Sequence, residues 1–130
     1  MKAEAYLLFK NDAKEAIEIY KFIFEAEVIQ EHLFQEGMTD NPALIGKIFH
    51  AELKIGDLNL YLCDTEQNAS YEAIKFVVET SDEDLAQAHF SKLSKHGKII
   101  QDFTKMPYGP TIGEAIDKFG IKWDIVICWF

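Results

Sequence analysis

The hydrophobic positions of the chain change their period several times, and each change predicts the start of a new element. Over residues 13–24 the apolar residues recur every three or four positions, which predicts an amphipathic helix of about three turns. Asn11 or Asp12 stands where a residue could cap this helix, and Glu15 completes a capping-box spacing with Asp12. The apolar stripe of the helix consists of Ala13, Ala16, Ile17, Tyr20 and Phe24.

Short apolar runs and strict alternation predict strands on either side of this helix, at residues 6–9, 28–36, 45–55 and 58–63. The third of these strands has two different faces. Its apolar phase contains Phe49, Ala51, Leu53 and Ile55, and its other phase contains Ile48, His50, Glu52 and Lys54. Gly56-Asp57 provides the turn into the fourth strand, and the polar residues 64–70 separate this half from the rest of the chain.

The second half repeats the same order of elements. It contains a strand at 73–79, a helix that Ser81 or Asp82 caps and His96-Gly97 ends, and a strand at 99–103. A loop around Tyr108 and a hairpin that turns at Phe119-Gly120 then lead to the last strand. The repeated order predicts an internal duplication and an α+β fold of two βαβββ modules, residues 1–64 and 71–130, within a single domain of residues 1–130.

A single helix covers only one face of a four-stranded sheet, so the opposite face must meet solvent, the other half or a ligand. The side chains expected there mix aromatic, charged and small residues, which favours a cleft for a small molecule. An ordinary half-exposed sheet is the alternative. The candidate ligand-binding residues on this reading are Phe9, His50, Glu52, Tyr61, Lys75, Tyr108 and Asp124.

The composition narrows the class of ligand. The net charge is −9, which argues against partners such as nucleic acids and anionic membranes. All thirteen basic residues are Lys, so a strongly anionic ligand would meet no guanidinium group. Cys63 and Cys128 are predicted to be free thiols. We find no apolar run that would span a bilayer and no signal peptide ahead of the first strand, and we therefore expect a cytoplasmic protein.

Several segments resemble the vicinal oxygen chelate superfamily, which includes glyoxalase I, bleomycin- and fosfomycin-resistance proteins and extradiol dioxygenases. Within it, the chain is most similar to the PhnB-like branch. The resemblance rests on Asn11 to Tyr20, Phe49 to Gly56, Tyr108-Gly109-Pro110 and Asp117 to Trp123. It implies a glyoxalase-like fold in which the two modules form paired half-barrels, a site in the concavity, and a homodimer.

The resemblance also implies where a metal would be held, on the first and fourth strands of each module. These positions fall at Ala5, at about Ala73, at about Tyr61 and at Asp124. Only Asp124 is a competent ligand for a divalent ion, whereas a catalytic site needs about three protein ligands. A register shift by one residue would place Tyr6 or Ile74 there instead. We therefore expect neither a metal nor another cofactor at the inherited positions.

These observations support three hypotheses about function. The leading one is a metal-independent protein that binds a small molecule in the cleft. The alternative is a divalent-metal lyase or isomerase with a relocated site at His50, Glu52 and Asp124. The third is an interaction protein whose concave face is filled by a partner. Trp129 and Phe130 are expected to pack on the body or on a second subunit.

Overall fold

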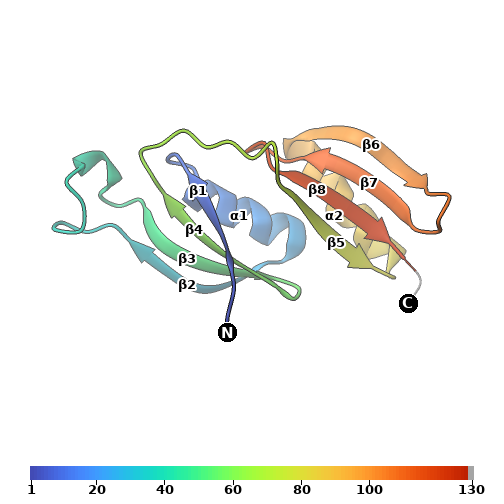
Figure 1. The fold of residues 1–130 in the computed structure, drawn as a ribbon, viewed down its shortest axis with the longest axis horizontal. Helices are drawn as coiled ribbons and strands as arrows, with labels where there is room; N and C mark the ends of the chain where they lie inside the picture. Colours follow the sequence, from blue (N-terminus) through green and yellow to red (C-terminus); the bar gives the residue numbers. More distant parts are fainter. Residues whose placement is uncertain (129–130) are drawn as a thin grey trace. The chain divides into compact units, whose positions relative to one another are not determined.

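The computed structural model describes residues 1–128, and these residues divide into two compact units, Met1–Ala69 and a second that begins at Ser70. Each unit contains one four-stranded sheet and one α-helix (Figure 1). The predicted α+β fold of two βαβββ modules, the glyoxalase-like fold, is confirmed. Trp129 and Phe130 lie outside the described residues, so the prediction for them remains a prediction.

The elements of the first unit are β1 (Ala5–Phe9), α1 (Ala13–Phe24), β2 (Glu27–Leu33), the 3-10 helix η1 (Pro42–Leu44), β3 (Ile48–Ile55) and β4 (Leu58–Asp64). The elements of the second unit are β5 (Lys75–Thr80), α2 (Glu83–His96), β6 (Lys98–Lys105), β7 (Thr111–Ile116) and β8 (Lys122–Ile127).

Both sheets have the same topology. The strand order is β1-β4-β3-β2 in the first unit and β5-β8-β7-β6 in the second. In each sheet the first strand pairs in parallel with the last, and the remaining pairs are antiparallel. Each helix packs on one face of its own sheet, and the apolar side chains of that face, such as Leu53, Leu62 and Trp123, are fully buried. The other face of each sheet is not covered by the helix of its unit.

The start of α1 is held by a residue distant in sequence. Asp12 occupies the N-cap position, as predicted, but its side chain makes no capping hydrogen bond. The backbone N–H of Ala13 instead donates to Asp64 Oδ1 over 3.0 Å, and the N–H of Ile48 donates to Asp64 Oδ2 over 3.0 Å. Asp64 is 2 % exposed. A buried carboxylate at the end of β4 therefore satisfies the first residues of both α1 and β3.

Helix α2 begins and ends where the sequence predicts. The Asp82 side chain accepts a hydrogen bond from the Leu85 N–H over 3.1 Å, as expected of an N-cap. The helix ends at His96, and Gly97 follows. Only glycine fits at this position, because a Cβ atom would collide with the carbonyl group of Ile116 in β7. A side chain here would force the end of α2 and β7 apart.

The third strand is shorter than predicted. It begins at Ile48 and not at residue 45, because η1 and a turn occupy the preceding residues. In this turn the Gly46 N–H donates to the Phe34 carbonyl over 3.0 Å, and the Phe34 N–H donates to the Lys47 carbonyl over 2.8 Å. The β2–β3 register shifts between His32 and Leu33. Phe49, which was predicted to join the apolar phase, is 43 % exposed as a result.

In the first strand, the residues that lie on the uncovered face are the alternate set to the one that the sequence predicted. Leu7 and Phe9 are buried on the helix side, with Phe9 2 % exposed, whereas Tyr6 and Leu8 are 44 % and 45 % exposed. Tyr6 pairs with Tyr61 in β4 and therefore shares its face of the sheet. Phe9, a predicted site residue, belongs to the core, and Tyr6 takes its place on the uncovered face.

Neither α-helix resembles a membrane span. Over residues 1–128, no helix combines the length and the apolar character needed to cross a bilayer.

The two hydrogen bonds of Asp64 lead to a prediction about stability. Replacing Asp64 by Asn should lower the free energy of unfolding by about 1 to 3 kcal/mol, because an amide has one acceptor oxygen and leaves one buried N–H unsatisfied. Urea denaturation would measure the change. Asp57→Asn removes the same charge from an exposed turn residue and should have little effect. Equal effects of the two substitutions would contradict the structural role of Asp64.

Candidate functional site

Three aromatic side chains pack together on the uncovered face of the first sheet. The Tyr6 hydroxyl lies 2.7 Å from His50 Nδ1, within hydrogen-bond distance. The ring centroid of Tyr61 lies 5.5 Å from that of Tyr6 and 4.9 Å from that of His50. Strands β1, β4 and β3 bring these residues together, since β4 lies between the other two. Glu52 pairs with Tyr61 across β3 and β4 and is 8 % exposed.

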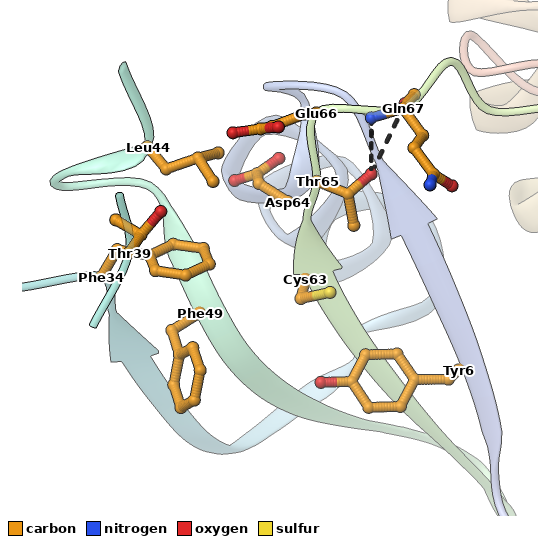
Figure 2. Close-up of a pocket in the computed structure, with 10 residues that line it drawn as sticks. All are labelled: Tyr6, Phe34, Thr39, Leu44, Phe49, Cys63, Asp64, Thr65, Glu66 and Gln67. Atoms are coloured by element: carbon orange, nitrogen blue, oxygen red, sulfur yellow. Dashed lines mark hydrogen bonds between the residues drawn. The ribbon is translucent and has the colours of Figure 1, made fainter. Parts of the chain in front are cut away.

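A pocket of about 560 Å³ opens beside this cluster. Its apolar walls come from β1, β3, β4 and the segment between β2 and β3 (Figure 2). The rings of Phe34 and Phe49 meet edge to face, with centroids 5.2 Å apart. The apolar and weakly polar lining residues are Tyr6, Phe34, Leu44, Phe49 and Cys63. Aromatic walls of this kind suit a flat apolar group.

The end of the pocket at the C-terminus of β4 is polar. Its lining residues there are Asp64, Thr65, Glu66 and Gln67, and Thr39 joins them from the β2–β3 segment. The Thr65 hydroxyl oxygen accepts a hydrogen bond from the Gln67 N–H over 3.3 Å, which folds this short segment over the end of the strand. The Glu66 side chain is exposed, and Figure 2 shows its carboxylate extending toward Leu44.

Two of the lining residues have perturbed ionisation. Burial raises the pKa of Tyr6 to about 12. Burial also raises the pKa of the Cys63 thiol, although its hydrogen bond with Tyr6 acts in the opposite direction. Cys63 is therefore a neutral thiol near pH 7, which is the less reactive form of a cysteine side chain.

The uncovered face of the second sheet carries a different arrangement. Lys75 Nζ lies 2.7 Å from Glu114 Oε2 and 3.3 Å from Asp124 Oδ2. Glu114 and Asp124 are direct partners across β7 and β8. The Asp124 Oδ1 atom is buried and has no hydrogen-bond partner among the described residues. This cluster of one cation and two acids is built on three adjacent strands.

The two acids of this cluster differ in pKa. The hydrogen bond from Lys75 is the main cause that lowers the pKa of Glu114. Burial is the main cause that raises the pKa of Asp124, and its hydrogen bond with Glu114 adds to the effect. Sequence reasoning missed Glu114, although its hairpin register opposite Asp124 could have identified it.

The structure brings some of the predicted site residues together within each unit. His50, Glu52 and Tyr61 share the uncovered face of the first sheet, and Lys75 and Asp124 share that of the second. Tyr108 is 75 % exposed in the loop between β6 and β7. None of the seven predicted site residues is among the lining residues of the pocket, which are Tyr6, Phe34, Thr39, Leu44, Phe49, Cys63, Asp64, Thr65, Glu66 and Gln67.

Within the described residues of each unit, no group of three His, Cys, Asp or Glu side chains is close enough to hold a metal ion. His50 and Glu52 lie in the first unit, and Asp124 lies in the second.

The fold is shared with several solved structures. A PhnB protein from Bacillus cereus is 23% identical, with a TM-score of 0.81 over 96% of this chain and 98% of its own. A Pseudomonas aeruginosa protein is 21% identical, with a TM-score of 0.80 over 96% of each chain. The fosfomycin resistance protein FosX from Listeria monocytogenes is 10% identical, with a TM-score of 0.73 over 100% of this chain and 94% of its own.

These likenesses show the fold of the chain. It is the glyoxalase-like fold expected from the sequence. A search of curated proteins found no match. The model of the 3-demethylubiquinone-9 3-methyltransferase family matches residues 1–126, and the chain belongs to that family.

The charge cluster of the second sheet leads to a prediction about titration. Replacing Lys75 by Met should raise the pKa of Glu114, because the ammonium group that stabilises its charged form is removed. Carboxyl ¹³C NMR shifts, followed from acidic to neutral pH, would measure the change. Lys54→Met removes a Lys from the first unit and should leave the Glu114 titration unchanged. An unchanged midpoint in Lys75→Met would show that the 2.7 Å ion pair does not persist in solution.

Proposed function

We propose that this chain binds a small molecule in the pocket on the uncovered face of the first sheet, without using the metal positions of the superfamily. This proposal is supported chiefly by the lining of the pocket, where Tyr6, Phe34 and Phe49 surround a hollow of about 560 Å³. Hollows of this size with aromatic walls and a few polar groups are the usual form of small-molecule sites. Membership of the PhnB-like branch, to which the likeness to the Bacillus cereus PhnB protein points, is compatible with this proposal.

The residues at the inherited metal positions support the second part of the proposal. Ala5 stands at the expected position in β1, and an alanine side chain has no donor atom. Tyr61 packs against Tyr6 and His50, and a neutral phenol is a weak ligand for a divalent ion. Asp124 is held in an ion pair with Lys75. The first sheet therefore offers a ligand aromatic surface and hydrogen-bonding groups.

A neutral aromatic probe would test the pocket directly. We expect 2-naphthylmethanol to slow the alkylation of Cys63 by iodoacetamide in a Cys128→Ser background, because Cys63 lies in the pocket wall. Phe49→Ala should weaken the binding of the probe by about 2- to 10-fold, which corresponds to the loss of one aromatic contact. The alkylation rate would be measured by mass spectrometry at increasing probe concentration.

Phe22→Ala is the matched control, because Phe22 is an exposed aromatic residue of α1 and does not line the pocket. The control should bind the probe as the parent protein does. If Cys63 were alkylated at the same rate with and without the probe, the pocket would not be the binding site.

A metal scan distinguishes this proposal from the relocated lyase or isomerase site. The EDTA-treated protein should keep the same thermal midpoint when Zn²⁺, Mn²⁺, Ni²⁺, Fe²⁺ or Mg²⁺ is added, since an ion that binds the folded state must raise the midpoint. His50→Ala and Asp124→Ala are the companion variants. A rise with one ion that both substitutions abolish would contradict the metal-free proposal.

A further inference from the structure

The charged residues that line the pocket of the first unit are all acidic. Asp64 and Glu66 are the charged members of the lining set, and no Lys or His side chain belongs to it. The remaining polar members are the neutral side chains of Tyr6, Thr39, Cys63, Thr65 and Gln67. An anionic ligand would therefore meet two negative charges and no positive one.

The two acids differ in what they can offer to a ligand. Each oxygen of the buried Asp64 carboxylate already accepts a backbone N–H, from Ala13 and from Ile48. Glu66 is exposed and has no ion-pair or hydrogen-bond partner among residues 1–128. Glu66 is thus the lining residue with a carboxylate free to accept hydrogen bonds.

Among the described residues, no Lys side chain forms an ion pair with Glu66. Lys10 Nζ donates to Asn68 Oδ1 over 3.0 Å. Lys2 Nζ lies 3.6 Å from Glu4 Oε1, and neither residue lines the pocket. No direct ion pair occupies the Glu66 carboxylate, so it is available to a cationic group of a ligand.

Building on the proposed binding of a small molecule in this pocket, we infer that the ligand carries a positive charge, an ammonium or amidinium group, beside a flat apolar body. The body lies between the rings of Phe34, Phe49 and Tyr6. The cation faces the carboxylate of Glu66, which follows the end of β4 and extends toward Leu44, another lining residue (Figure 2). The faces of aromatic rings attract cations and also pack against apolar surfaces. The aromatic part and the acidic part of the lining therefore favour the same ligand.

Three probes that share one ring system separate the contribution of charge from that of shape. They are 2-naphthylmethylammonium, the neutral 2-naphthylmethanol and the anionic 2-naphthoate. Amide ¹H–¹⁵N shifts of the labelled full chain give both the dissociation constant and the position of each probe. Physiological ionic strength screens the attraction that the net charge of −9 exerts on any cation. We expect the cation to bind about 3- to 10-fold more tightly than the alcohol and the anion to bind most weakly.

Two matched variants assign the preference to one residue. Glu66→Gln should abolish the preference for the cation and leave the affinity for the alcohol unchanged. Glu27→Gln removes a charge from β2, opposite Lys54, and should keep the preference. A preference that survives in Glu66→Gln would overturn the inference, because the charge of the whole chain would then account for it.

The outcomes separate this inference from the function on which it rests. If the alcohol shifts the amide signals of Thr65 and Gln67 as strongly as the cation does, the pocket binds ligands but the inference about charge fails. If none of the three probes shifts these signals, the proposed function fails together with the inference.

Discussion

The carboxylate of Asp64 links the start of helix α1 and the start of strand β3 to the end of strand β4 in the first unit. It stands at the end of β4, and its two oxygens bind the first N–H of α1 and the first N–H of β3. A buried charge is costly unless it is hydrogen-bonded, and here both oxygens are. The pocket begins at the same point, because Asp64 is followed directly by Thr65, Glu66 and Gln67. The residue that fixes the helix therefore also fixes the polar end of the candidate site.

The fold could be predicted from the sequence because its signals are local and repeated. Helical spacing of apolar residues, alternation in the strands and the cap at Asp82 each indicate an element, and the second half repeats the first. The cap of α1 could not be predicted in the same way. Its acceptor, Asp64, lies 51 residues from Ala13 in sequence, whereas Asp12 offered a plausible acceptor next to the helix. Local patterns do not distinguish between the two.

The residues of the uncovered face were predicted only in part, and those of the pocket were not predicted, for a similar reason. The alternation in β3 correctly put His50 and Glu52 on the uncovered face, but a run of four apolar or aromatic residues in β1 has no clear phase. The register with β4 decides that Tyr6 and not Phe9 shares the face of Tyr61. The register shift beside His32 similarly moves Phe49 from the expected core to the wall of the pocket. Such shifts depend on pairing between strands, which the pattern of one strand does not record.

The two sheets share a topology, yet their uncovered faces differ in chemistry. The first presents aromatic rings and a free carboxylate, and the second presents a Lys neutralised by two acids. In both, the alternation of the strands keeps the residues of the uncovered face apart from those that pack under the helix. Substitutions on one uncovered face can therefore accumulate without disturbing the packing beneath either helix. The duplicated architecture gives such a chain two surfaces on which selection can act separately, so that one can acquire a new specificity while the other retains an older role.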